Sequence, residues 1–201
     1  MGELSKKVCV VGAGSWGANH IRVLNAMGSL GGIVDSDQLR IQHLRKIHKN
    51  IAFYYNVSDS FKDSFDGYIV ATPAATHFQI AKIIIQNRSH VLVEKPLALN
   101  VKDASELNEL AQENEINLMV GHLLLFHPAI LKIKQVIAEG AIGELQYLYS
   151  NRLNLGTIRS EENILWSFAP HDISIFQFLV NKFPIEVLSR GGCFVQTDLH
   201  D

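Results

Sequence analysis

The first 120 residues alternate short apolar runs with longer segments in which hydrophobic residues recur at helical spacing. Continuous apolar runs are typical of parallel strands covered on both faces, and they predict strands at residues 8–11, 31–34, 51–54, 68–71, 90–93 and 117–120. The intervening segments predict helices at residues 16–27, 38–48, 76–86 and 101–114. Strands alternating with helices predict an α/β domain built on a doubly wound parallel sheet.

The pattern changes near Gly121. From there the sequence predicts a helix at 128–139, an alternating strand at 145–155, a helix at 172–180 and a strand at 185–190. This order is α+β, so we place a domain boundary at about residue 120, between a first domain at 1–120 and a second at 121–201. Two or three strands are hard to stabilise alone, so we expect the second domain to be incomplete and the chain to be truncated.

Composition excludes several classes of protein. Hydrophobic residues make up 47% and charged residues 19% of the chain, which favours a packed core over disorder. A net charge of −2 favours neither nucleic acid nor an anionic membrane as a partner, and no apolar run is long enough to span a bilayer. Cys9 and Cys193 form no disulfide or metal pattern. We therefore expect a cytoplasmic protein.

A glycine-rich motif follows the first predicted strand directly. It reads Gly12-Ala13-Gly14-Ser15-Trp16-Gly17, which is G-x-G-x-x-G between a strand and a helix. The three glycines allow a tight turn, a close approach of the backbone to a pyrophosphate, and packing of the helix on the strand. The start of the helix favours phosphate through its free N–H groups and its dipole. With Asp35 ending the second strand, 18 positions after Gly17, this context predicts a Rossmann dinucleotide-binding domain.

Asp35 also predicts which dinucleotide binds. A carboxylate at this position accepts a hydrogen bond from the adenosine 2′-hydroxyl and repels a 2′-phosphate. The next residues are Ser36 and Asp37, and no arginine follows at once. The sequence therefore favours NAD over NADP.

Polar residues that could bind a ligand or act in catalysis follow two further predicted strands. The fourth strand runs into Ala71-Thr72-Pro73, with His77 in the next helix, and the fifth runs into Glu94-Lys95-Pro96. Doubly wound folds bind ligands at this carboxyl edge. With the glycine motif, the T-P-x-x-x-H and E-K-P segments resemble the Gfo/Idh/MocA oxidoreductases over the whole chain. The cofactor-binding residues expected are Gly12, Ala13, Gly14, Ser15, Trp16, Gly17, Asp35, Ser36, Thr72, Pro73, His77, Glu94 and Lys95.

The resemblance implies the catalytic residues. Lys95 corresponds to the family's catalytic lysine, next to the nicotinamide and the substrate hydroxyl, with a cis bond before Pro96. The family's D-x-x-x-H pattern matches His171, but Ser167 replaces its Asp, which leaves the role of Asp172 open. Oxidation of an alcohol needs a base, and a histidine needs less tuning of its pKa than a lysine, so His171 is the favoured base.

Structural readings of the same residues stay open. Lys95 could be a surface lysine at a strand end, and His171 could start a helix after Pro170. His77 is interpreted as packing near the cofactor. His122 and His127 are interpreted as structural, because no acid or cysteine joins them at ligand spacing, and no metal is expected.

The second domain suggests a substrate. Arg152 and Asn154 lie on one face of the predicted strand and suit hydroxyl, acetamido or carboxylate groups, although a solvated strand face fits equally. The stretches at 121–128, 150–156 and 166–174 resemble the WlbA/WbpB-like nucleotide-sugar 3-dehydrogenases. This implies oxidation of the 3-hydroxyl of UDP-N-acetylglucosamine or its uronic acid, in polysaccharide biosynthesis. The substrate-binding residues expected are Lys95, Arg152, Asn154, His171 and Asp172.

The resemblance leaves two alternatives and implies an assembly. Family members usually pair through the open face of the second sheet, so a homo-oligomer is expected of the full-length form. A dehydrogenase of a free sugar or inositol is one alternative function. A non-catalytic NAD-binding sensor is another, suggested by Ser167 in place of the family's Asp.

Overall fold

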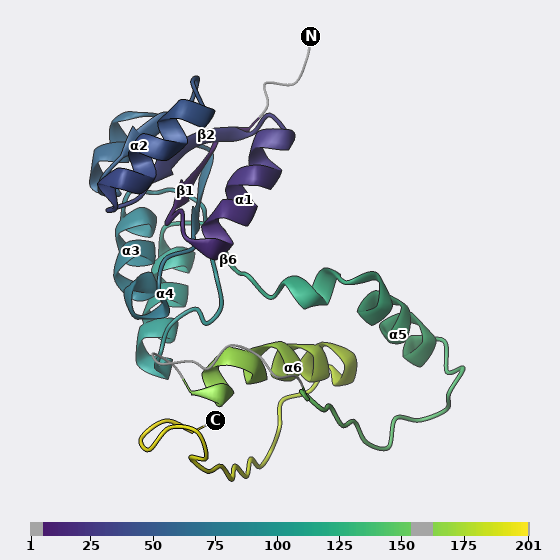
Figure 1. Cartoon of the computed structure of the whole chain (residues 1–201). Helices are drawn as coiled ribbons and strands as arrows, with labels where there is room; N and C mark the ends of the chain where they lie inside the picture. Colours follow the sequence, from purple (N-terminus) through teal and green to yellow (C-terminus); the bar gives the residue numbers. More distant parts are fainter. Residues whose placement is uncertain (1–5, 154–162, 201) are drawn as a thin grey trace. The chain divides into compact units, whose positions relative to one another are not determined.

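The computed structural model describes residues 6–153 and 163–200. The chain divides into two compact units, Met1–Gly121 and His122–Asp201, which we call unit 1 and unit 2 and describe separately. Figure 1 shows the sheet and its helices in unit 1, followed by the helices of unit 2.

The core of unit 1 is a six-stranded parallel sheet in the order β3-β2-β1-β4-β5-β6. Its strands are β1 (Val8–Val11), β2 (Leu30–Val34), β3 (Ala52–Tyr54), β4 (Gly67–Val70), β5 (Val91–Val93) and β6 (Leu118–Val120). From β1 the chain builds outward to β3, and from β4 it builds outward in the other direction to β6. The order therefore reverses between β1 and β4, whose carboxyl ends flank the crevice where such sheets bind ligands.

Helices cover both faces of this sheet (Figure 1). They are α1 (Ser15–Ala26), α2 (Gln38–Ile47), α3 (Ala74–Gln86) and α4 (Val101–Glu113), with a short 3-10 turn, η1 (Ser58–Lys62). Val10 of β1 is buried in a cluster with residues of α1 and α2, whereas Cys9 and Val11 are buried in a second cluster with residues of α3 and α4. Neighbouring residues of a strand point to opposite faces, so both clusters need apolar residues and the strands read as continuous apolar runs.

The elements predicted for unit 1 are confirmed. Within the described residues, its six strands and its helices α1 to α4 begin and end within two residues of the predicted positions. The predicted α/β parallel sheet is confirmed with them. The turn η1 was not predicted, because a single helical turn is too short to show a periodicity.

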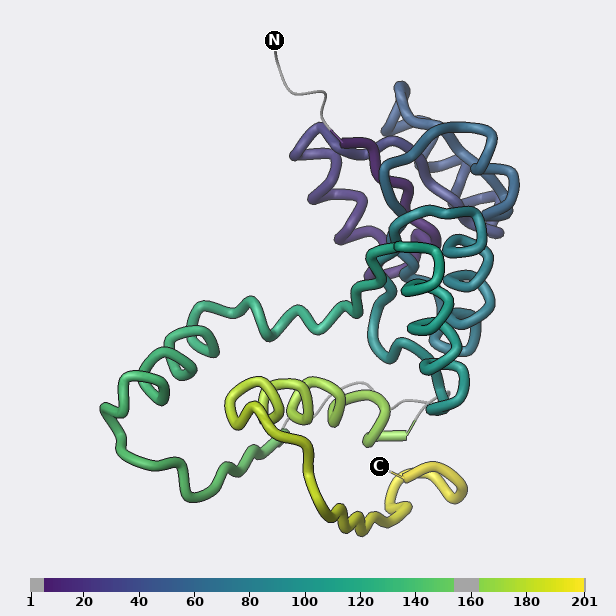
Figure 2. The backbone as a smooth tube through the Cα atoms, turned by 180° about the vertical axis from the view of Figure 1, so that it is seen from behind, coloured from purple at the N-terminus to yellow at the C-terminus, as the bar shows by residue number. Residues whose placement is uncertain are grey.

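Unit 2 contains η2 (Leu123–Phe126), α5 (Pro128–Ala138) and α6 (Ile164–Val180). The helix predicted at 128–139 is confirmed as α5. The strands predicted at 145–155 and 185–190 are wrong, because residues 145–153 and 185–190 are irregular chain. The path of the backbone through both segments can be followed in Figure 2. A strand needs a neighbour to take up its N–H and C=O groups, and among the described residues neither segment is paired in a sheet.

The helix α6 begins eight residues earlier than the predicted helix at 172–180. The side chain of Asn163 caps it, with Oδ1 accepting a hydrogen bond from the backbone N–H of Trp166 at 3.0 Å. Pro170 lies inside the helix. His171 therefore lies in the body of α6, and the interpretation of it as a helix-starting residue is wrong.

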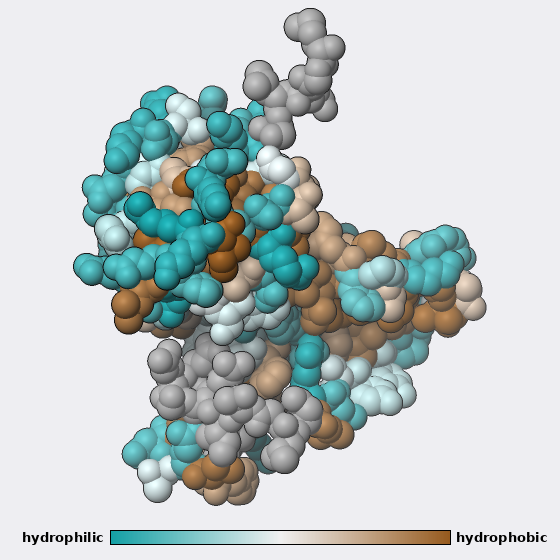
Figure 3. Space-filling model, turned by 45° about the horizontal axis from the view of Figure 1, so that its top comes forward, coloured by the Kyte–Doolittle hydropathy of each residue, from teal (hydrophilic) through white to brown (hydrophobic). Residues whose placement is uncertain are grey.

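The described part of unit 2 buries little of its apolar surface. Its buried residues are Ser167 and Leu179, both on α6. Its most exposed large hydrophobic side chains include Phe126, Tyr147, Tyr149, Leu153, Phe183, Ile185 and Leu188. Figure 3 shows hydrophobic side chains at the molecular surface. In the part of the chain that the structure describes, no helix combines the length and the apolar character needed to cross a bilayer.

Candidate functional site

The turn after β1 packs directly on the turn after β4. Gly12 has a φ of +90°, and a Cβ at this position would lie 2.8 Å from the carbonyl oxygen of Ala71 and from Cγ2 of Thr72. A Cβ at Gly17 would lie 1.8 Å from the carbonyl oxygen of Gly12. Glycine is thus required at both positions by the backbone conformation and by packing.

The packing of the protein does not explain why residue 14 is a glycine. Gly14 is the N-cap of α1, and a Cβ there would meet no protein atom within 4 Å. The first N–H groups of α1 have no side chain at Gly14 to cap them, so they are available to an anion. Ser15 and the half-exposed Trp16 lie in the same first turn. The open space above Gly14 and the uncapped helix start together fit a dinucleotide pyrophosphate.

Asp35 lies at the carboxyl end of β2, nearly buried, and four hydrogen bonds hold its carboxylate. Oδ2 accepts from the backbone N–H of Ala13 at 2.7 Å, and Oδ1 accepts from that of Asp37 at 2.8 Å. Nη1 of Arg40 donates to both oxygens, at 3.0 and 3.2 Å. Burial raises the pKa of Asp35, but the two backbone hydrogen bonds and Arg40 outweigh it and leave the pKa below its usual value.

The side chain of His77 bridges two loops at the carboxyl edge of the sheet. It lies on α3 with 1% of its surface exposed. Its Nε2 is 2.8 Å from the carbonyl oxygen of Thr72, and its Nδ1 is 2.7 Å from that of Pro96. Pro73 is the N-cap of α3 and accepts from Thr76. His77 therefore acts beneath the surface, where it holds the turn after β4 against the loop after β5.

Glu94 is a buried carboxylate at the end of β5. His20 of α1 donates from Nε2 to Oε1 of Glu94 at 2.8 Å, and the backbone N–H of Lys95 donates to Oε2 at 3.3 Å. A Cβ at Gly121 would lie 3.0 Å from Oε2, so Gly121 leaves room for this carboxylate. Burial raises the pKa of Glu94, but the hydrogen bonds from His20 and from the backbone of Lys95, together with the charge of Lys95, outweigh it and lower the pKa.

Lys95, the residue after Glu94, lies at the carboxyl edge of the sheet. It follows β5 directly and is partly exposed, and its bond to Pro96 is cis, as the family resemblance implied. β5 is separated from β1 by β4 alone, so Lys95 lies on the same edge of the sheet as Gly12 and Thr72. Unit 1 thus brings together the predicted residues from four strand ends.

In unit 2 the predicted residues gather around Asp172 of α6. Arg152 donates to its carboxylate from Nε at 2.9 Å and from Nη2 at 3.2 Å, and Ser150 donates from Oγ at 2.9 Å. Burial raises the pKa of Asp172, but the hydrogen bonds from Arg152 and Ser150 outweigh it and lower the pKa. His171 is the neighbouring residue on α6, whereas Asn154 lies outside the described residues. The proposed catalytic pair is therefore divided, with Lys95 in unit 1 and His171 in unit 2.

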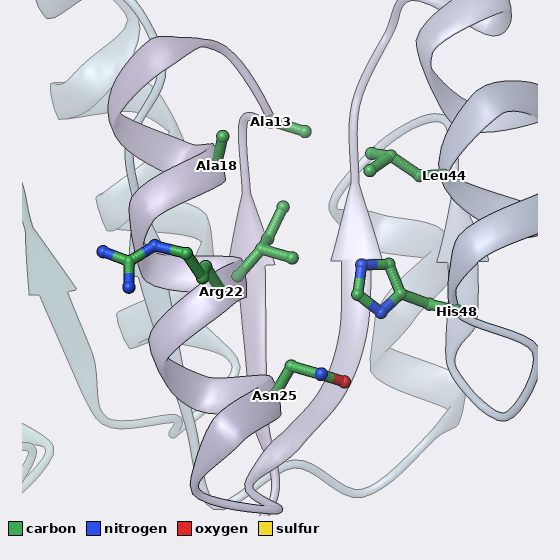
Figure 4. A pocket seen from close by; sticks show the side chains of 7 residues that line it. Ala13, Ala18, Arg22, Asn25, Leu44 and His48 are labelled. Atoms are coloured by element: carbon green, nitrogen blue, oxygen red, sulfur yellow. The ribbon is translucent and has the colours of Figure 1, made fainter.

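A shallow hollow of about 240 Å³ lies between α1 and α2 (Figure 4). It is lined by Ala13, Ala18, Ile21, Arg22, Asn25, Leu44 and His48. Of the predicted cofactor residues only Ala13 borders it. The candidate site is therefore the carboxyl edge of the sheet, where Gly12, Thr72 and Lys95 lie, rather than this hollow.

Sequence reasoning missed three polar residues of these arrangements: His20, Arg40 and Ser150. Arg40 left a signal, because Asp37 is a recognisable N-cap and places Arg40 in the first turn of the helix that follows Asp35. His20 left none, since its partner Glu94 is 74 positions away. Ser150 likewise left no signal, because its partner Asp172 is 22 positions away. Ser150 also lies in a segment that was predicted to be a strand and is irregular chain.

Comparison with known proteins gives the same fold. The family model of the Gfo/Idh/MocA oxidoreductases, described by an NAD-binding Rossmann fold, matches residues 6–122. UDP-N-acetylglucosamine 3-dehydrogenase of Acidithiobacillus ferrooxidans is 30% identical over 193 residues, which are 96% of this chain and 59% of that protein.

Two solved structures are similar as well. A probable dehydrogenase from Thermotoga maritima has a TM-score of 0.83 at 23% identity, over 94% of this chain and 60% of the other. The WlbA dehydrogenase from Bordetella pertussis, in complex with NADH and UDP-GlcNAcA, has a TM-score of 0.65 at 24% identity, over 71% of this chain and 42% of the other.

This chain spans about three fifths of the curated relative from Acidithiobacillus, or 59% of its length. The family match nevertheless covers more than half of this chain, residues 6–122, and includes the glycine motif, Asp35 and Lys95. The sheet order and the geometry at its carboxyl edge are those of a dinucleotide-binding domain. The chain therefore belongs to the Gfo/Idh/MocA oxidoreductase family and carries its NAD-binding Rossmann domain.

Proposed function

We propose that this chain serves the NAD-dependent oxidation of a sugar hydroxyl, namely the 3-hydroxyl of UDP-N-acetylglucosamine or of its uronic acid. One observation carries this proposal. Lys95 lies at the cofactor-binding sheet edge of a chain that is 30% identical, over 96% of its length, to a UDP-N-acetylglucosamine 3-dehydrogenase.

Unit 1 would hold the cofactor through the uncapped N-terminus of α1 and through Asp35. NAD, when bound, supplies the acceptor for the hydride that leaves the sugar carbon. The N-terminus of α1 at Gly14 would bind the pyrophosphate, and Asp35 would accept a hydrogen bond from the adenosine ribose. Both groups are held by backbone atoms, so little ordering remains to be done on binding.

The proton of the oxidised hydroxyl needs a separate acceptor. A lysine ammonium next to the hydroxyl polarises its oxygen as a point charge, which is the role we assign to Lys95. A histidine removes the proton with less adjustment of its pKa, and we assign this role to His171. Glu94, held by His20 and by the backbone N–H of Lys95, keeps the lysine loop in place.

The Arg152–Asp172 pair suits the polar groups of the sugar. Asp172 engages Nε and one N–H of Nη2, so further N–H donors of the guanidinium stay available for hydroxyl, acetamido or carboxylate oxygens. The pair supports a role for Asp172 as the residue that would orient Arg152, even though Ser167 replaces the family's Asp. We expect Arg152→Ala to raise KM more than it lowers kcat, since it would remove binding shared by the ground and transition states.

A binding and turnover screen tests this proposal. NAD-loaded protein is titrated calorimetrically with UDP-N-acetylglucosamine, its uronic acid, UDP-glucose and myo-inositol, and NADH formation is followed for each. We expect binding and NADH formation with the N-acetylated UDP-sugars. Turnover of inositol alone would replace this function with that of a free-polyol dehydrogenase. NAD binding with no response to any sugar would favour a sensor.

A further inference from the structure

Among the residues that the structure describes, one side chain donates to the buried carboxylate of Glu94. Nε2 of His20, on α1, donates to Oε1 at 2.8 Å. The backbone N–H of Lys95 reaches Oε2 only at 3.3 Å, which is longer than an ordinary N–H···O hydrogen bond. Glu94 is 7% exposed, and a buried charge is costly unless donors satisfy it. The anionic form of Glu94 therefore depends mainly on His20.

The carboxylate of Glu94 has little room to find another partner. A Cβ at Gly121, the residue after β6, would lie 3.0 Å from Oε2 and 3.1 Å from Cδ, so the chain packs against this side of the carboxylate. The backbone of Glu94 is fixed as well, because its N–H donates to the carbonyl oxygen of Val70 at 2.9 Å. If His20 were removed, either a cation would have to move to the carboxylate or the carboxylate would have to take up a proton.

A cation already acts on Glu94 from the lysine loop. The charge of Lys95 lowers the pKa of Glu94, so the ammonium lies within electrostatic range of the carboxylate. A lysine carries three donors on a flexible stem, and opposite charges attract more strongly at a buried site than in water. Movement of Lys95 toward Glu94 needs side-chain rotation alone, which makes it the simplest response to the loss of His20.

We propose that His20 is a positioning residue for Lys95. By donating to Oε1 of Glu94, it keeps the lysine ammonium from folding back onto that carboxylate and leaves it directed to the sheet edge, where the substrate hydroxyl would lie. His20 acts through Glu94 and so connects α1, the helix that follows the glycine motif, to the loop of the proposed catalytic residue. The direction of the ammonium concerns unit 1 alone, whereas its use in oxidation rests on the proposed function.

Chemical labelling of Lys95 tests the proposal without a sugar substrate. The purified chain is treated with a limiting amount of N-acetoxysuccinimide at about pH 8, where carboxylates are ordinarily ionised. Acetylation of Lys95 is measured by peptide mass spectrometry relative to Lys102, an exposed lysine at the start of α4. The proteins compared are the wild type, His20→Ala, His20→Gln, Glu94→Gln and the double variant His20→Ala/Glu94→Gln. His43→Ala is the matched control, because it removes an exposed histidine from α2, and thermal unfolding verifies that every variant is folded.

We expect His20→Ala to slow the acetylation of Lys95 about tenfold, because an ammonium held in a charge-assisted hydrogen bond reacts poorly. His20→Gln keeps an N–H donor for Oε1 and should restore most of the reactivity, and His43→Ala should change nothing. The double variant has no carboxylate to draw the lysine, so it should react like Glu94→Gln. The proposal is overturned if Lys95 reacts equally in the wild type and in His20→Ala, if the double variant stays slow, or if His20→Gln is as slow as His20→Ala.

Steady-state kinetics extend the test to the proposed reaction. With UDP-N-acetylglucosamine, we expect His20→Ala to lower kcat about tenfold, with KM and NADH affinity nearly unchanged, and to cause no further loss in a Lys95→Met background. A further loss in that background would mean that His20 acts independently of Lys95, which also overturns the proposal. If the wild type oxidises no UDP-sugar, the proposed function fails, while the labelling of Lys95 still decides the role of His20.

Discussion

Unit 1 and unit 2 are similar in their supply of apolar residues but differ in how they bury them. In unit 1 each side of the sheet is covered by helices, and residues such as Cys9, Val10 and Ile33 are fully buried. In the described part of unit 2 only Ser167 and Leu179 are buried, and large side chains such as Phe183 are exposed. An apolar pattern yields a stable element only where another layer covers it.

The same difference separates the two groups of functional residues. Asp35, Glu94 and His77 of unit 1 are buried and fixed by backbone groups or by buried partners. Arg152 and Asp172 of unit 2 are held mainly by each other and by Ser150 on a more exposed surface. We therefore expect unit 1 to bind its ligand in a largely preformed site, and the polar groups of unit 2 to tolerate more adjustment.

The largest expected difference between the units is in hydrogen exchange. Backbone amides of β1 and β4 should exchange only on global unfolding, whereas those of α5 should exchange through local opening. We expect protection to differ by a factor on the order of 10³ or more, because local openings cost far less than global unfolding. Exchange followed by mass spectrometry on the NAD-bound chain measures this, and equal protection in both units of a monomer would contradict the comparison.

The next largest effect concerns the two residues proposed as catalytic, one in each unit. Lys95→Met in unit 1 and His171→Ala in unit 2 should each lower kcat about 10²–10⁴-fold, the usual loss on removing a positioned acid or base. Both should leave NADH affinity nearly unchanged, because the glycine motif and Asp35 are untouched. Steady-state kinetics and NADH titration check this. If both variants turn over a bound UDP-sugar at wild-type rates, these are not the catalytic residues.

A pair of glycine variants separates packing from ligand binding inside unit 1. Gly17→Ala would place a Cβ 1.8 Å from the carbonyl oxygen of Gly12, and we expect a loss of about 1–3 kcal/mol in unfolding free energy. Gly14→Ala meets no protein atom within 4 Å, so stability should hold while NADH affinity falls. Urea unfolding and NADH titration measure the two effects, and Gly14→Ala with unchanged NADH affinity would mean that the pyrophosphate lies elsewhere.

The smallest expected effect is a pH dependence in unit 2. The folded-state pKa of Asp172 lies below its unfolded value, so its ion pair stabilises the chain above about pH 4, the usual value for aspartate. This contribution is lost as pH falls through the lowered pKa. Asp172→Asn should cost up to about 1 kcal/mol at pH 7, because the pair is partly exposed, and nearly nothing at pH 2. Thermal unfolding of the wild type and of Asp172→Asn at pH 7 and pH 2 measures this loss of stability. An equal loss at both pH values would mean that the substitution acts through packing and not through the ion pair.

The sequence by itself determined the strands and helices of unit 1 and the sheet edge at which its candidate site residues lie. Strand and helix periodicities act over a few residues, and they placed Gly12, Gly14 and Gly17 in a strand–turn–helix, and Asp35 and Lys95 at strand ends. Parallel strands bring their carboxyl ends to one edge, so the position of the candidate cofactor site followed from local patterns. Membership in the family was visible in the same residues.

Tertiary structure decided what depends on distant partners. The segments at 145–153 and 185–190 alternate like strands but are irregular, because no described neighbour takes up their backbone groups. His77 was interpreted as packing near the cofactor, but its partners, the carbonyl oxygens of Thr72 and Pro96, are known only from the folded chain. His20 and Glu94, 74 positions apart, meet only in the folded chain. Periodicity records which face of an element is apolar, but the residue that meets a given side chain is set by how the elements pack.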